Sequence, residues 1–218
     1  MFRRVAAASA FVLVSIFLLS PSGRAQFSTP ESAYTQVHDA AALRPPAGAH
    51  VAIIEFEDLQ CPDCRRANPI VEAAAKKFHI PVVRHDFPLP FHTWSFQAAV
   101  DARWFDTHSR QLGHQFRDAV FAAQPTIKDH KDLQAFAARF ARQHGLSFPA
   151  NPDPNGKLRE MVKADYELGL DIGVKHTPTI WVVTNQTTHK PFIEVLDRSH
   201  LDALIQKAEA ETREASNR

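Results

Sequence analysis

The chain has 218 residues, of which 22% are charged, and its 25 lysines and arginines nearly balance its 24 acidic residues. The formal net charge is +1, and the two signs are interspersed along the chain. This balance excludes an extended basic surface for nucleic acid and a polybasic arm for a membrane, so we expect the function to come from a local site.

Residues 1–25 have the pattern of a secretory signal peptide. Arg3 and Arg4 precede an almost wholly apolar run, which is followed by the small residues Gly23 and Ala25. The run is shorter than the roughly 20 apolar residues that span a bilayer. The pattern predicts export to a periplasmic or extracellular location, with an uncleaved membrane anchor as the alternative.

A β-α-β unit follows a polar lead-in over residues 26–47, which ends in a Pro-Pro pair typical of a domain boundary. The run 51–56 is short, apolar and β-branched, as in a buried strand. Pro62 suits the first turn of a helix, which we predict over 62–78, and a second strand is predicted over 80–85.

The middle of the chain, 91–172, is predicted to be helical, because apolar residues recur on single faces at helical spacing. A strand pair is expected next, at 179–183 and 192–196. A last helix then begins near Ser199, with a frayed tail after Glu211.

This order of elements predicts an α/β protein with a thioredoxin fold, that is, β-α-β followed by β-β-α. The core of the fold comprises residues 48–90 and 173–214. The helical subdomain, 91–172, is inserted between these two parts.

The only two cysteines, Cys61 and Cys64, lie where the first strand meets the helix. A bridge between them closes too small a loop to add much stability, so a redox role is favoured. The helix N-terminus favours a thiolate at Cys61, the expected nucleophile, and Cys64 would then resolve the mixed disulfide. Half of a zinc site is the alternative, but structural zinc needs four ligands, and we expect neither a metal nor a cofactor.

Three segments carrying these residues resemble the DsbA-like family of bacterial disulfide oxidoreductases. They are 55–64, 87–92 and 173–179, and the resemblance runs in order over residues 48–212. It implies that Pro178 is a cis-proline facing the disulfide, with Thr177 before it, in a loop that lays a substrate strand beside the cysteines. An ordinary turn before a strand is the alternative for this pair.

The resemblance also implies a role for Glu55 as a buried acid that relays protons with Cys64, since burial raises the pKa of a carboxyl group. A solvated acid at the end of the strand is the alternative. The neighbouring Glu57 and Asp58 are expected to be surface acids, and His92 is expected to cap a helix or pack in the core.

Two positions depart from the family pattern. Asp63 stands where a strongly oxidising member would have histidine, and an anion there should stabilise the Cys61 thiolate less. His176 stands where glycine is common, and it either returns a positive charge to the site or is a solvated loop residue. We expect Pro62, Asp63 and the loop 176–178 to contact the substrate.

The sequence thus predicts an exported thiol–disulfide oxidoreductase acting on cysteine-containing exported proteins. Oxidation is the expected direction, and the resemblance implies reoxidation by a quinone-linked membrane partner. The alternatives are a reductase or isomerase, a redox-inactive binding module, or a metal chaperone. A monomer is expected, because residues 26–50 are too few for the N-terminal dimerisation domain of the dimeric isomerases.

Overall fold

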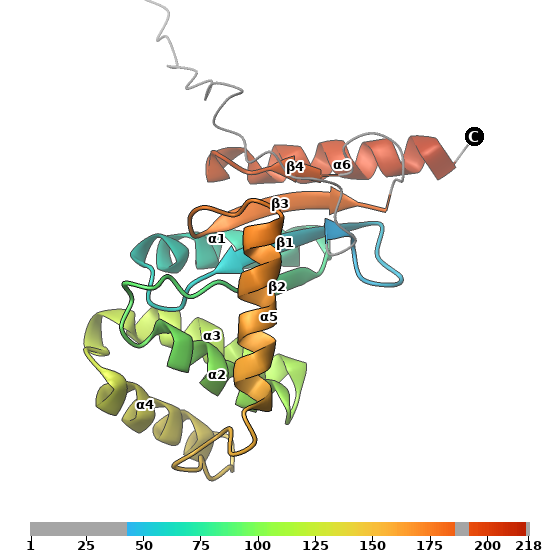
Figure 1. Ribbon diagram of the computed structural model, residues 1–218. Coiled ribbons are helices and arrows are strands. Elements are labelled where there is room, and N and C mark those ends of the chain that lie inside the picture. The colour runs from blue at the N-terminus through green and yellow to red at the C-terminus, as the bar shows by residue number, and fades with distance from the viewer. Residues whose placement is uncertain (1–42, 186–191, 217–218) are drawn as a thin grey trace, which may run out of the picture.

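The computed structural model describes residues 43–185 and 192–216 (Figure 1). The predicted signal peptide, 1–25, and most of the predicted lead-in, 26–47, lie outside the described residues. Among the helices that are described, none is both long and apolar enough to cross a bilayer.

The core of the fold is a four-stranded mixed sheet with the order β2-β1-β3-β4. β1 runs parallel to β2 and antiparallel to β3, which in turn pairs antiparallel with β4. All residues of the two central strands are buried, because both faces of the sheet are covered. The strands are β1 (Val51–Glu57), β2 (Val82–Asp86), β3 (Thr179–Thr184) and β4 (Phe192–Glu194).

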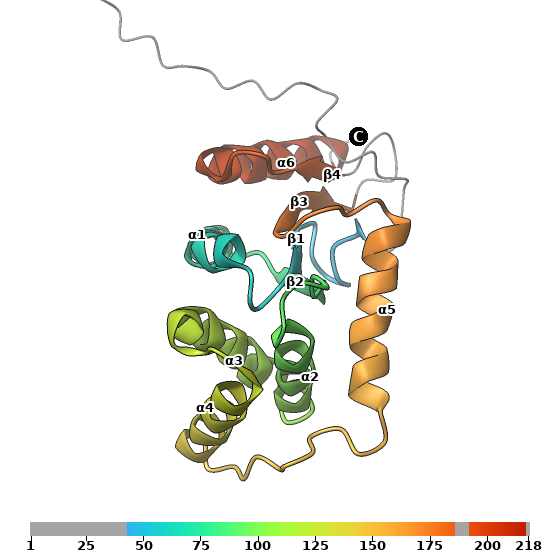
Figure 2. The ribbon, with the colours of Figure 1, turned by 60° about the vertical axis from the view of Figure 1, so that its left-hand side comes forward.

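Helices cover the two faces of this sheet in different ways (Figure 2). On one face, α1 (Pro62–Phe78) and α6 (Leu201–Ser216) share an apolar cluster with β1 and β3. On the other face, α5 (Lys157–Asp171) packs beside a second cluster that centres on Phe56 and Trp181.

The helical block between β2 and α5 has a core of its own, which includes both cysteines. Phe105, Phe116 and Phe140 lie in tilted or edge-on contact at its centre. Its helices are α2 (Ser95–Asp106), α3 (Arg110–Ala123) and α4 (His130–Gln143), and the 3-10 turn η3 (Gln124–Thr126) follows α3.

Buried ion pairs join this block to the sheet. Arg117 of α3, whose side chain is only 4% exposed, lies 3.4 Å from Glu57, 3.5 Å from Asp86 and 3.2 Å from Asp106. Arg103 of α2 lies 2.5 Å from Asp86 as well. The two arginines therefore compensate carboxylates that strands β1 and β2 carry into the interior.

The element predictions are largely confirmed, and α1 has the predicted bounds. The second strand begins at Val82 rather than residue 80, because His79 adopts φ 55° and the amide of Ile80 donates to the carbonyl oxygen of Ala75, as in a helix C-cap. The predicted fraying after Glu211 is wrong, since α6 continues to Ser216.

Candidate active site

The two cysteines lie at the N-terminus of α1, just beyond the end of β1. Cys61 is the N-cap residue, and Pro62 occupies the first helical turn. Cys61 is 7% exposed and Cys64 is completely buried, and both are free thiols. The amide of Asp58 donates to Cys64 Sγ at 3.4 Å. Only one sulfur of the pair therefore borders solvent.

The environment separates the acidities of the two thiols. The pKa of Cys61 falls from 9.0 to about 5, chiefly through a hydrogen bond with Cys64, with smaller contributions from Thr177 and from the amides of Cys64 and Asp63. Burial, followed by the hydrogen bond with Cys61, raises the pKa of Cys64 well above its ordinary value. The pKa of Cys61 is lowered, which is the expected direction, but the partner thiol contributes more than the amides of the helix terminus.

The Thr177–Pro178 loop faces the cysteines, and its peptide bond is cis, as the family resemblance implied. The carbonyl oxygen of Thr177 lies 3.4 Å from Cys61 Sγ. Thr177 is buried, with an Oγ1 atom that has no hydrogen-bond partner. His176 is exposed instead and pairs with Thr179, whose hydroxyl donates to the carbonyl oxygen of His176 at 2.7 Å.

Glu55 is buried on β1, on the sheet face that α1 covers. It is 1% exposed, and neither carboxylate oxygen has a hydrogen-bond partner. Burial raises its pKa from 4.5 to about 8, although the charge of Arg84 opposes this. Its electrostatic influence reaches Cys64. The alternative of a solvated acid at the end of the strand is therefore wrong.

Asp58 and Glu57 are not surface acids, contrary to the sequence expectation, because each is 1% exposed. The carboxylate of Asp58 binds the loop that leads into α2: it accepts from the amide of Leu89 at 2.7 Å and from the hydroxyl of Ser95 at 2.5 Å. His92 Nδ1 lies 2.7 Å from the same carboxylate. His92 thus contacts a buried acid rather than serving only as a cap or in packing.

The carboxylate of Asp63 is held by two arginines. Arg198, in the 3-10 turn η4 (Arg198–His200) before α6, donates to both of its oxygens at 2.8 and 3.1 Å. Arg66, one turn further along α1, lies 3.1 Å away. The hydrogen bond with Arg198 is the main cause of the lowered pKa of Asp63.

Sequence reasoning missed Arg198 and Gln124, both of which touch the site from distant segments. The Gln124 side chain donates to the carbonyl oxygens of Leu59 at 3.0 Å and Cys61 at 3.1 Å, and so fixes the loop that carries the nucleophile. Neither residue belongs to a local motif, so only the fold could identify them.

One group of side chains has the spacing of a metal site: Glu72, His114 and Asp118 each offer a ligand atom within 4.8 Å of the others. Arg84 donates to Glu72 at 2.7 Å, and the amide of Asn68 donates to Asp118 at 3.1 Å. Both carboxylates are thus already hydrogen-bonded, and Glu72 compensates a buried guanidinium. An ion-pair network accounts for this group.

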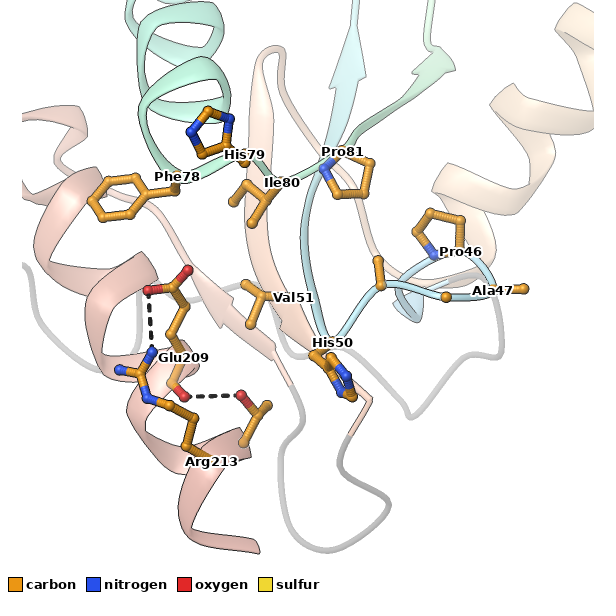
Figure 3. A pocket seen from close by; sticks show the side chains of 13 residues that line it. Pro46, Ala47, His50, Val51, Phe78, His79, Ile80, Pro81, Glu209 and Arg213 are labelled. Atoms are coloured by element: carbon orange, nitrogen blue, oxygen red, sulfur yellow. Dashed lines mark hydrogen bonds and ion pairs between the residues drawn. The ribbon is translucent and has the colours of Figure 1, made fainter. Parts of the chain in front are cut away.

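A cavity of about 870 Å³ lies at the opposite end of β1 from the cysteines (Figure 3). It is lined by the loop before β1, the end of α1 and the last turns of α6, where Arg213 pairs with Glu209. A second cavity of about 660 Å³ borders β2. Neither includes a cysteine, so the redox site is distinct from both.

Comparison with known proteins agrees with this geometry. A family model described as thioredoxin matches residues 46–207. No curated protein matches the chain.

Solved structures share the fold at low sequence identity. Alpha-DsbA1 of Wolbachia pipientis is 18% identical with a TM-score of 0.60, and the match covers 77% of this chain and 92% of that one. DsbA2 of Pseudomonas aeruginosa is 20% identical with a TM-score of 0.54, over 75% and 91%. A periplasmic thioredoxin-like protein from Salmonella enterica serovar Typhimurium is 17% identical with a TM-score of 0.60, over 76% and 88%.

Proposed function

Since the chain belongs to the thioredoxin family and is, with its Cys61–Cys64 pair, a thiol–disulfide oxidoreductase, we propose that it oxidises cysteine pairs in exported proteins. The observation that carries this direction is the position of Cys61 at the N-cap of α1, beside the buried Cys64 and the Thr177–Pro178 loop, a setting that lowers the pKa of the Cys61 thiol to about 5. A stabilised thiolate stabilises the reduced protein, and the disulfide of such a protein is a stronger oxidant. A reductase or isomerase remains the alternative.

The reaction proceeds by two thiol–disulfide exchanges. A substrate thiolate attacks Cys61 Sγ, the Cys61–Cys64 bond breaks, and Cys64 leaves as a thiolate. The second substrate thiolate then attacks the substrate sulfur of the mixed disulfide, and Cys61 leaves as a thiolate. Two electrons pass from the substrate dithiol to the protein disulfide.

In this proposal Glu55 supplies the proton that Cys64 takes up. With a pKa of about 8, Glu55 is mostly protonated at neutral pH and so can donate a proton when the Cys64 thiolate forms. Cys64 has a raised pKa and holds that proton firmly. After the transfer Glu55 is a carboxylate, and it is then reprotonated from solvent.

The Thr177–Pro178 loop, Pro62, Asp63 and His176 form the proposed substrate contact. Pro62 and His176 are exposed beside Cys61, whereas Thr177 and Pro178 are buried next to it. An extended segment of the substrate would lie along this loop, which brings its cysteine to the Cys61 sulfur.

Export, partners and assembly belong to the same proposal. Two features support action outside the cytoplasm: residues 1–25 have the pattern of a signal peptide, and the chain shares its fold with a periplasmic thioredoxin-like protein from Salmonella enterica. We propose cysteine-containing exported substrates, reoxidation by a quinone-linked membrane partner, and a monomeric state. We also propose that the chain divides into a core and a helical insertion. The core comprises residues 48–90 and 173–214, and the insertion comprises residues 91–172.

Equilibration of the purified protein with glutathione redox buffers tests the direction. We expect the disulfide to be clearly more oxidising than thioredoxin, whose potential is about −270 mV. A potential near that value would favour the reductase alternative.

Two single-cysteine variants test the roles within the pair. With a disulfide-bonded substrate, Cys64→Ala should accumulate a mixed disulfide, because the Cys61 thiolate attacks one substrate sulfur, the other substrate cysteine leaves as a thiolate, and no second cysteine resolves the adduct. Cys61→Ser should accumulate none, because Cys64 is buried. If the Cys61 variant forms the adducts and the Cys64 variant does not, the assignment of nucleophile is reversed.

A further inference from the structure

We propose that Arg198 is a positioning residue of the redox site that acts through Asp63: it clamps the Asp63 carboxylate and cancels its charge beside the Cys61 thiolate. The inference rests on the proposed function and adds a residue that no sequence motif indicates. Arg198 follows Asp63 by 135 positions in the chain and reaches the site only because η4 lies beside the N-terminus of α1.

The geometry of this pair is that of a two-pronged guanidinium–carboxylate contact. Nη1 donates to Asp63 Oδ2 at 3.1 Å, and Nη2 donates to Oδ1 at 2.8 Å. Paired hydrogen bonds of this kind fix the orientation of the carboxylate as well as neutralise it. The Arg198 side chain is 27% exposed and that of Asp63 37%, so the contact is partly buried and partly screened by solvent.

Arg66 offers an internal comparison, because it also touches Asp63. Its side chain is 63% exposed and lies three residues along the same helix. Exposed pairs of this type contribute little, since water and salt screen them and both side chains lose freedom. The charge of Asp63 is therefore compensated mainly by Arg198.

The turn that carries Arg198 is itself held in place. The Asp197 side chain accepts from the amide of Ser199 at 2.9 Å, which caps the 3-10 turn. Leu201, directly after the turn, is 1% exposed and anchors α6 in the apolar cluster shared with α1. The guanidinium thus extends from a fixed backbone.

Compensation matters because Asp63 lies between the two cysteines. An anion close to Cys61 disfavours the thiolate, and for this reason Asp63 was expected to stabilise the thiolate less than a histidine would. The charge of Arg198 also interacts with Cys64 and Glu55, which both raise the pKa of Arg198 after the larger effect of Asp63. One guanidinium therefore links the residue between the cysteines to the two buried groups beneath them.

The test is a cycle of variants at these positions in the full-length chain, with the ultraviolet absorbance of the Cys61 thiolate followed against pH. Arg198→Gln should raise the Cys61 pKa by about one unit, because an uncompensated carboxylate then remains nearby. The matched control, Arg66→Gln, removes an equal positive charge that also lies beside the Asp63 carboxylate. It should shift the Cys61 pKa by less than about a third as much as Arg198→Gln does.

The cycle separates action through Asp63 from direct action on the thiolate. In an Asp63→Asn background, Arg198→Gln should produce less than half of its original shift, since no carboxylate is left to compensate. Arg198→Lys keeps the positive charge but not the two-pronged guanidinium contact. Because the charge is what compensates Asp63, this variant should keep the Cys61 pKa close to that of the wild type. Thermal unfolding of each reduced variant verifies that it is folded.

Two outcomes would overturn the inference: Arg198→Gln shifts the Cys61 pKa no more than Arg66→Gln does, or its shift is undiminished in the Asp63→Asn background. Failure of the proposed function looks different. In that case the wild type equilibrates with glutathione at a potential near that of thioredoxin, or does not exchange at all, whereas the thiolate titration needs no turnover and still reports on Arg198.

Discussion

Glu55 shows at the residue scale how a site residue can reduce the stability of the fold that holds it. Its two carboxylate oxygens are buried without a hydrogen-bond partner. Below pH 4.5 the group is protonated in both the folded and the unfolded chain, so it has no effect on their balance. As pH rises from 4.5 towards 8, the unfolded chain loses the proton while the folded chain keeps it, and the unfolded state is favoured.

We therefore expect Glu55→Gln to stabilise the reduced protein by about 3 kcal/mol at pH 7 and by almost nothing at pH 4. Glutamine has the shape of the protonated acid and does not ionise. Urea unfolding of both proteins, fully reduced, across pH 4–8 measures the difference. A difference that does not grow with pH would show that Glu55 titrates normally.

Glu72 serves as a control of opposite sign. Burial alone would raise its pKa, but hydrogen bonds with His114 and Arg84 hold it at about 2. Its stabilising contribution is present at neutral pH and is lost as pH falls through its folded pKa. Glu72→Gln should therefore lower the free energy of unfolding at pH 7, the pH at which Glu55→Gln raises it.

The sequence allowed prediction of the site residues that form motifs, and not of those that meet only in the folded chain. Cys61 and Cys64 were indicated by a short pattern, and the cis state of Pro178 was implied by the family resemblance. Arg198 was not, because nothing near residue 198 marks it as a partner of Asp63. The same is true of Asp58, whose burial depends on the loop that folds over it.

At the scale of elements, helix α5 approaches the sheet so closely that one position has no room for a side chain. A Cβ atom at Gly169 would lie 2.5 Å from Cδ2 of Phe87 and 3.0 Å from Cδ1 of Phe56. The glycine is therefore a packing requirement within an otherwise ordinary helix, and it fixes how α5 crosses the sheet.

Gly169→Ala should destabilise the protein by about 1–3 kcal/mol, because overpacking outweighs the better helix propensity of alanine. Urea unfolding measures this loss, and Glu167→Ala at an exposed position of the same helix should change stability by less than about 0.5 kcal/mol. Replacing the facing ring with a smaller side chain, Phe87→Leu, should restore part of the stability that Gly169→Ala loses. A neutral or stabilising Gly169→Ala would mean that the ring moves aside freely.

Element types and most boundaries followed from hydrophobic spacing and from cap residues. The exact bounds of α1 came from Pro62 and from the apolar face of that helix. The end of α6 was misjudged, because its polar composition resembles a frayed tail and the burial of Thr212 is a tertiary effect. Likewise, the start of β2 depends on the C-cap at His79, which no simple pattern signals.

At the scale of the whole molecule, the helical block and the sheet are joined by charges rather than by apolar packing alone. Arg117 compensates Glu57, Asp86 and Asp106 at once and is almost fully buried. Its removal would leave these three carboxylates short of one positive charge, with Arg84 still beside Glu57 and Arg103 still beside Asp86 and Asp106. The sequence shows these charges but not their convergence, because they come from β1, β2, α2 and α3.

Arg117→Met should lower the free energy of unfolding by about 3–5 kcal/mol, the usual cost of breaking a buried ion pair from one side. Arg110→Met removes an exposed arginine from the same helix and should have little effect. Urea titration monitored by tryptophan fluorescence compares the two variants with the wild type. Equal effects of the two substitutions would show that the buried pairs contribute no more than a surface charge.

The placement of both cysteines in the core of the helical block has a practical consequence for chemical labelling. The chain contains two thiols in all: Cys61 is partly accessible and acidic, whereas Cys64 is enclosed and holds its proton. An alkylating reagent in mildly acidic solution thus meets one reactive sulfur, and a second adduct requires α1 to separate from the helical block. The mass of the labelled chain reports, molecule by molecule, whether that separation has occurred.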